Sequence, residues 1–318
     1  FKAYAGADVV PLPAPSTARP GALDIGMLSS LLWHTAAVNL VRGPVHFRTA
    51  PSSGALFATE LYLVTREVTG LRPGLWHYDP QAHALRRMGS APPDASALGT
   101  TMRTPVLLLA SAVFRRSGHK YRDRCYRYVL ADLGHAIENL RATAAALRMP
   151  ARFAKAFDES HAAAVLGLDE AQEGVLALVG LGSEDGAPAP LPLSWDPAPL
   201  ATGTALGVTE AIHRATSLRM RARATGERAA VAPRTAPAAN VGDATDATVL
   251  PAPRRHTLGT PQAIARRRSI RRYRETPLPL NALSALLDAA LRRDAPVWSD
   301  AVRVDVVTLA VDALPVAA

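Results

Sequence analysis

The sequence has very little cysteine, few lysines and no long apolar run. Its one cysteine, Cys125, excludes a disulfide framework and a zinc site built on several cysteines. No apolar run reaches about 18 residues, so no membrane span is expected. No secretion signal is visible, so the expected compartment is the cytoplasm. The nine histidines show no pair at ligand spacing on a helix, so no metal site is expected.

The positive charge is confined to one part of the chain. The net charge is +9, but residues 214–274 alone carry +11, from 14 arginines and three acidic residues. The remaining residues therefore carry −2 and are close to neutral. This distribution argues against a nucleic-acid-binding protein, which is kept as an alternative for the basic stretch alone.

Hydrophobic periodicity predicts a mixed α+β domain over residues 1–185. Apolar residues recur at helical spacing in two segments, and four other segments are rich in β-formers or continuously apolar. The predicted helices are 23–38 and 126–149, and the predicted strands are 61–68, 75–78, 105–113 and 174–181. The first two strands are separated by a turn at 70–74 and are expected to form a hairpin.

Residues 186–259 are rich in Pro, Ala and Arg and are expected to form a linker. A short amphipathic helix is predicted around 206–218. Residues 229–253 have almost no large apolar side chain, so disorder is expected there.

Residues 260–318 are predicted to repeat the start of the chain. Helices are expected at 262–273 and 279–291, and a strand at 302–311. The sequence LPLNALSALL at 278–287 matches LDIGMLSSLL at 23–32. We therefore predict a tandem duplication whose second copy is truncated.

Two stretches stand out as candidate sites. The first runs from Arg48 to Gly54 and includes Pro51, Ser52 and Ser53, which supply a rigid turn and hydrogen-bond donors; an ordinary loop is the alternative. The second is the arginine-rich stretch 266–273, where guanidinium groups beside Ser269 suit a phosphate. A solvated basic face or a nucleic-acid patch are the alternatives for the second.

These stretches, with three further motifs, resemble a known family. The motifs are ELYLV at 60–64, PGLWHYDP at 73–80 and KYRDRCYRYVLADLGHAIEN at 120–139. Together with RRSIR at 267–271 they resemble the SagB-type dehydrogenases of the flavin-dependent nitroreductase superfamily. The segment at 120–139 is the most specific, because it is similar to that family's Lys-Tyr-Gly-x-Arg and Gly-His-x-x-x-Asn pattern.

The resemblance implies a nitroreductase-like α+β fold, with a mostly antiparallel sheet flanked by helices. It implies FMN bound at a dimer interface and the oxidation of thiazolines or oxazolines in a ribosomally made peptide to azoles. The expected partners are this peptide and a cyclodehydratase complex. A general NAD(P)H-dependent nitroreductase, or a degenerate scaffold of a peptide-modifying complex, remain as alternatives.

The resemblance also assigns roles to residues of this chain. Lys120 and Tyr121 would be the catalytic pair that takes the ring proton. The residues implied to bind the cofactor are Arg48, Pro51, Ser52, Ser53, Gly54, Asn139, Arg267, Arg268, Ser269 and Arg271. Of these, the four from Arg267 onward would hold the FMN phosphate and ribityl chain, the loop 51–54 would line the flavin ring, and Asn139 would support the site.

Each copy departs from the family pattern in a complementary way. The first copy lacks the Arg-Arg-Ser motif before its first helix, and the second lacks the Pro-Ser-Ser-Gly loop. The family's glycine after Lys-Tyr is Arg122 here. We therefore predict an intramolecular pseudo-dimer with one composite FMN site, a homodimer being the other possibility.

Overall fold

The computed structural model describes residues 2, 4–15, 23–183, 189, 191–195, 207–220, 248–254, 257–291, 306, 308–312 and 314. The linker predicted at 229–253 and the strand predicted at 302–311 lie largely outside the described residues. The chain forms two compact units, residues 1–227 with 260–268, and residues 228–259 with 269–318.

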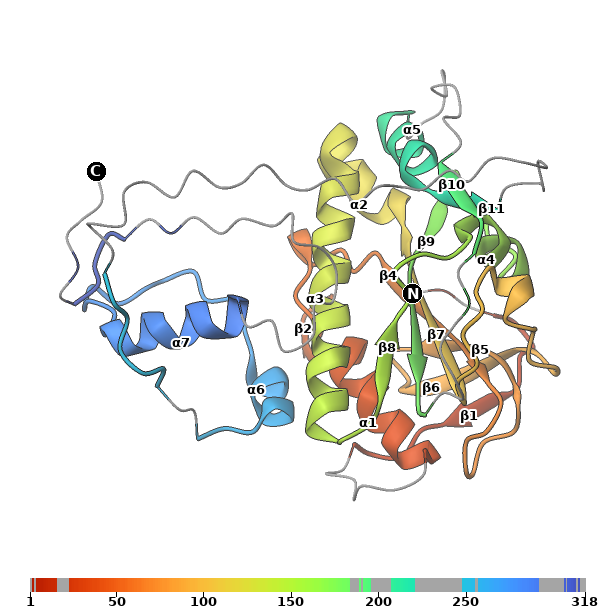
Figure 1. The fold of residues 1–318 in the computed structure, drawn as a ribbon, viewed down its shortest axis with the longest axis horizontal. Helices are drawn as coiled ribbons and strands as arrows, with labels where there is room; N and C mark the ends of the chain where they lie inside the picture. Colours follow the sequence, from red (N-terminus) through yellow and green to blue (C-terminus); the bar gives the residue numbers. More distant parts are fainter. Residues whose placement is uncertain are drawn as a thin grey trace. The chain divides into compact units, whose positions relative to one another are not determined.

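The first unit is built on a seven-stranded sheet in which every pair of neighbouring strands is antiparallel (Figure 1). The strand order is β1-β6-β5-β4-β7-β9-β8. The strands are β1 (Val9–Pro11), β4 (Thr59–Thr65), β5 (Gly74–Asp79), β6 (Ala84–Gly89), β7 (Val106–Val113), β8 (Ala151–Phe153) and β9 (Glu173–Leu181). The predicted fold class, an antiparallel sheet with flanking helices, is confirmed.

Two shorter pairs of strands lie outside this sheet. The strands β2 (Val38–Arg42) and β3 (Val45–Arg48) form a hairpin, and β10 (Leu193–Trp195) pairs with β11 (Leu218–Met220). The β2–β3 hairpin, which turns at Gly43 and Pro44, was not predicted from the sequence. Its strands are half-exposed and partly polar, so they carry little alternation of apolar side chains.

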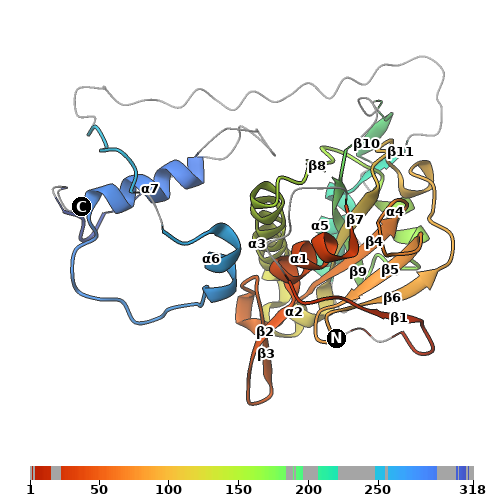
Figure 2. The ribbon, with the colours of Figure 1, turned by 90° about the horizontal axis from the view of Figure 1, so that it is seen from below.

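Helices cover both faces of the sheet (Figure 2). The helices of this unit are α1 (Ile25–Ala36), α2 (Phe114–Tyr121), α3 (Cys125–Ala146), α4 (Glu159–Val165), α5 (Gly207–Thr216) and α6 (Thr260–Arg266), with single 3-10 turns η1 (Ser53–Ala55), η2 (Ser96–Leu98) and η3 (Arg122–Arg124). The helices α1 and α3 bury one apolar face each in one core with the sheet, and α4 packs in a second core on the opposite face. None of the described helices is long and apolar enough to span a bilayer.

A helix follows a parallel β-bridge in each of the two units, and the duplication stays a prediction. In the first unit Asp24 caps α1, accepting a hydrogen bond from the Met27 amide at 2.7 Å, and forms a parallel bridge with Thr69. In the second unit α7 (Leu280–Leu291) follows a parallel bridge between Leu278 and Val311. A helix that begins at a parallel bridge thus occurs in both units.

The short helix α6 belongs to the first unit although it lies far along the sequence. It packs against α3 and α1, and the Asn39 side chain donates a hydrogen bond to the Ala265 carbonyl at 3.1 Å. The helix predicted over 262–273 is too long, because α6 ends at Arg266. The Arg268 guanidinium donates a hydrogen bond to the Ala265 carbonyl. A carbonyl in the last turn of α6 is thus bonded to a side chain and not to the backbone amide of a further helical turn.

Candidate functional site

The loop that leads into β4 is held by a carboxylate from α3. The Asp132 side chain accepts hydrogen bonds from the Ser52 hydroxyl at 2.7 Å, the Ser53 hydroxyl at 2.9 Å and the Ser53 amide at 2.9 Å. Gly54, Ala55 and Phe57 have positive φ angles in this loop. Non-glycine residues are rare in that conformation, so the loop stores strain that the Asp132 contacts hold in place.

The predicted catalytic pair lies directly over this loop. A methyl group built on Gly54 would lie 2.8 Å from the Tyr121 hydroxyl and 2.9 Å from the Lys120 ammonium group. Because Gly54 has no side chain, the Tyr121 hydroxyl and the Lys120 amine can both approach the loop backbone there. Lys120 is exposed and Tyr121 half-exposed, so their polar ends are open to a bound molecule.

Below the loop, Glu60 contacts a histidine and two arginines at the start of β4. Its carboxylate accepts a hydrogen bond from His77 at 2.6 Å, pairs with Arg116 of α2, and lies 4.0 Å from Arg48. Burial alone would raise the pKa of Glu60, but the His77 hydrogen bond and the two guanidinium groups lower it to about 2.

Arg48 is the last residue of β3 and approaches Glu60 from the β2–β3 hairpin. Its guanidinium is almost fully buried and donates to the Thr59 carbonyl at 2.7 Å. Burial lowers the pKa of Arg48 to about 10, and Glu60 opposes that change. The side chain thus lies against β4, and its proposed contact with a cofactor remains a prediction.

Two of the predicted phosphate ligands lie in the same unit as the loop. The Arg267 guanidinium donates to the Thr49 carbonyl at 3.2 Å, two residues before Pro51. Burial and the neighbouring charge of Arg268 lower the pKa of Arg267. Two adjacent guanidinium groups, one of them partly buried, are suited to an anion that neutralises both.

The other predicted ligands are placed less directly. Asn139, on α3, donates to the His34 carbonyl at 3.1 Å and so links α3 to α1. Ser269 and Arg271 are exposed and belong to the second unit. The first unit therefore brings together the loop 51–54, the pair 120–121 and the arginines 267–268.

Three residues of the site were not predicted from the sequence, namely Asp132, Glu60 and Arg116. Asp132 and Glu60 were quoted only as parts of motifs, although each is an acidic residue on the buried side of an apolar segment. A buried carboxylate requires partners, and that requirement is the signal that could have found both.

We expect Asp132→Asn to destabilise the chain by about 1.5–3 kcal/mol, because it replaces charge-assisted hydrogen bonds by weaker ones. Urea unfolding followed by circular dichroism measures the change. The exposed Glu138 on the same helix, changed to Gln, is the matched control. Equal stabilities of the two variants would contradict the role given to Asp132.

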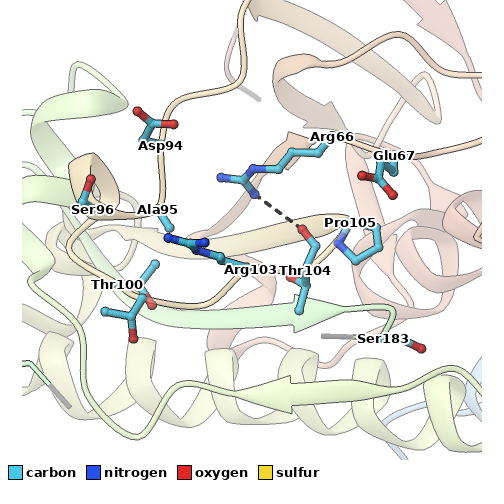
Figure 3. Close-up of a pocket in the computed structure, with 11 residues that line it drawn as sticks. Arg66, Glu67, Asp94, Ala95, Ser96, Thr100, Arg103, Thr104, Pro105 and Ser183 are labelled. Carbon is cyan, nitrogen blue, oxygen red and sulfur yellow. Dashed lines mark hydrogen bonds between the residues drawn. The ribbon is translucent and has the colours of Figure 1, made fainter. Parts of the chain in front are cut away.

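A cavity lies where β4 ends and β7 begins, at the opposite end of these strands from the loop 51–54 (Figure 3). It has a volume of about 580 Å³ and is lined by Arg66, Arg103, Glu67 and Asp94 among others. Arg66 donates to the Pro93 carbonyl at 2.9 Å and points toward Thr104 (Figure 3). Its two arginines and two carboxylates balance in charge, so the lining favours neither an anion nor a cation.

The chain is similar to known proteins over most of its described part. The model of the Nitroreductase family matches residues 20–183 and 264–314, which is more than half of the chain. The nitroreductase homologue MJ1384 of Methanocaldococcus jannaschii is 29% identical over 154 residues, 46% of this chain and 76% of MJ1384. The trifolitoxin-processing protein TfxB of Rhizobium leguminosarum bv. trifolii is 31% identical over 136 residues, 38% of this chain and 36% of TfxB.

A solved structure has the same fold. The crystal structure of a nitroreductase homologue from Anabaena variabilis superposes with a TM-score of 0.68 at 24% identity. The match covers 91% of this chain and 61% of that protein. The chain thus spans about three fifths of that protein and little more than a third of TfxB.

Proposed function

Since this chain belongs to the nitroreductase family, we propose that it is an FMN-dependent dehydrogenase that oxidises thiazoline or oxazoline rings of a ribosomally made peptide to azoles. The observation that carries the proposal is the position of Lys120 and Tyr121 over Gly54. The similarity to TfxB, a protein named for processing a peptide toxin, supports a peptide as substrate. A cyclodehydratase that makes the ring is the partner this reaction requires.

The described residues fit FMN in two respects. Gly54 has no side chain, so the loop backbone is bare where the Lys120 amine and the Tyr121 hydroxyl approach it, as a site for a flat ring beside this pair requires. Arg267 and Arg268 form a pair of guanidinium groups in the same unit, as a phosphate requires. In this proposal the loop 51–54 lines the flavin ring, and Asn139 supports the loop side through α1.

The reaction removes two hydrogens from adjacent ring atoms, one as a hydride and one as a proton. FMN, when bound, supplies the acceptor for the hydride and its electron pair. Lys120 takes the proton, and the Tyr121 hydroxyl orients the ring toward it. A lysine takes a proton in this way only in its neutral form, and the Lys120 nitrogen lies 5.6 Å from the centroid of the Tyr121 ring.

A general NAD(P)H-dependent nitroreductase is the second candidate, because the family match and MJ1384 support it without a peptide. The two functions differ in the molecule that donates electrons to the flavin. Under anaerobic conditions a thiazoline-containing peptide should bleach the flavin absorption of the holoprotein, and NADPH should not. Bleaching by NADPH alone would favour the second candidate. Absence of bleaching by either donor would favour a scaffold.

We expect the composite site to hold one FMN per chain, with Arg267 and Arg268 as phosphate ligands. The double variant Arg267→Gln/Arg268→Gln should raise the Kd for FMN at least about tenfold, since each lost charge-assisted bond contributes about 1.5–3 kcal/mol. Flavin fluorescence titration measures both the stoichiometry and the Kd. Arg266→Gln, exposed at the end of α6, is the control. Two flavins per chain, or an unchanged Kd in the double variant, would disprove the composite site.

A further inference from the structure

Arg122 occupies a backbone conformation that favours glycine. It follows Tyr121 directly and has a φ of +48° and a ψ of −128°. Residues with a side chain are disfavoured there, and such strain persists mainly where function maintains it. The arginine is exposed, so packing does not explain its presence. The position thus retains a charged side chain at a cost in stability.

Two further arginines lie close to Arg122 in the sequence, near the rings of Tyr121 and Tyr128. Arg124 and Arg127 are exposed on η3 and the first turn of α3. The Tyr121 and Tyr128 rings lie 4.3 Å apart, and the Arg124 guanidinium lies 5.4 Å from the Tyr128 ring. We name Arg122, Arg124 and Arg127 with these two tyrosine rings the basic corner.

The basic corner carries more positive than negative charge in the part of the chain that the structure describes. Other arginines there pair with acids, such as Arg141 with Glu138 at 2.6 Å. Neither Arg122 nor Arg127 forms an ion pair among the described residues. Asp123 is the single acidic residue in the stretch from Arg122 to Arg127. A compact positive surface therefore adjoins Lys120 and Tyr121.

We propose that the basic corner binds an acidic segment of the peptide substrate and thereby sets substrate specificity. This inference rests on the proposed function, since it places the segment beside the ring that Lys120 deprotonates. Exposed guanidinium groups pair with carboxylates, and the two tyrosine rings, tilted by 35° to each other, offer an apolar surface for the peptide beside them. A nucleic acid fits less well, because three cations at one helix corner supply fewer contacts than a phosphate backbone typically requires.

Binding can be measured apart from catalysis. Two fluorescein-labelled peptides without an azoline ring, one carrying four glutamates and the other four glutamines, are titrated with the full-length holoprotein by fluorescence anisotropy. We expect the glutamate peptide to bind more tightly. Arg122→Gln/Arg127→Gln should weaken its binding up to about 25-fold, since each of the two exposed ion pairs contributes up to about fivefold. Arg72→Gln, an exposed arginine after β4, should have no effect.

Arg122→Gly separates a binding role from a structural one. Glycine relieves the positive φ, so the Tm should stay equal or rise, while the affinity for the glutamate peptide falls. An unchanged affinity in Arg122→Gly and in the double variant would overturn the proposal. So would equal affinity of the wild type for both peptides, or tighter binding of a labelled single-stranded oligonucleotide. Failure of the proposed function would instead appear in the flavin-bleaching assay, which these titrations do not use.

Discussion

Replacing Lys120 by alanine should slow azole formation by about 10²–10⁴-fold while FMN remains bound, because general-base catalysis contributes about that factor. The Lys120 ammonium group lies beside the space over Gly54, and the structure places no other lysine there. Stopped-flow bleaching of the flavin by a thiazoline peptide measures the rate. The absorption of the purified variant measures the bound flavin.

Lys155→Ala is the matched control, since Lys155 is also exposed but lies after β8. Azole formation at the wild-type rate in Lys120→Ala would show that another group takes the proton. Loss of bound flavin in the variant would show that Lys120 holds the cofactor. Tyr121→Phe, which keeps the ring and removes the hydroxyl, tests the other member of the pair.

Glu60→Gln should destabilise the fold by about 3–5 kcal/mol, because removal of one partner leaves buried cations without a counter-charge. Arg48 would remain almost fully buried, and Arg116 would lose the contact that fixes α2 to β4. Denaturant unfolding measures the change, with the exposed Glu67→Gln as control. A loss of less than about 1 kcal/mol, the range of surface ion pairs, would contradict this role.

The pKa of Glu60 also predicts how folding stability changes with pH in the acidic range. The pKa of Glu60 is about 2 in the folded chain and 4.5 in a free side chain. Between these values the unfolded chain binds the proton and the folded chain does not, so stability rises with pH. The contribution of Glu60 is therefore fully present above pH 4.5 and is lost as the pH falls to about 2. Glu60→Gln should flatten this part of the curve.

The long regular elements were predictable from the sequence because their apolar patterns are strong. The helices α1 and α3 and the strands β7 and β9 lie within about three residues of the predicted ranges. The strand β6 was missed, since it contains Arg86 and Arg87 and resembles a polar loop. The helix α2 was missed as well, because Gly118 and its charged residues give it little apolar periodicity.

The candidate site, like the fold, was predicted from the sequence only in part. The loop 51–54 and the pair 120–121 were predicted from the resemblance, because they are short contiguous motifs. The contact between Asp132 and Ser52 joins residues 80 positions apart, and that between Arg116 and Glu60 joins residues 56 apart. Such pairs depend on how α2 and α3 pack against the sheet, and no local pattern encodes that packing.

The position of α6 has a consequence for how the protein responds to dilution. A site shared between two separate molecules falls apart at low concentration, whereas Arg267 and Thr49 belong to one chain and meet in one unit. The Asn39 side chain donates to the Ala265 carbonyl, the Arg267 guanidinium donates to the Thr49 carbonyl, and α6 packs against α3 and α1. The position of Arg267 beside Thr49 is therefore expected to be independent of the protein concentration.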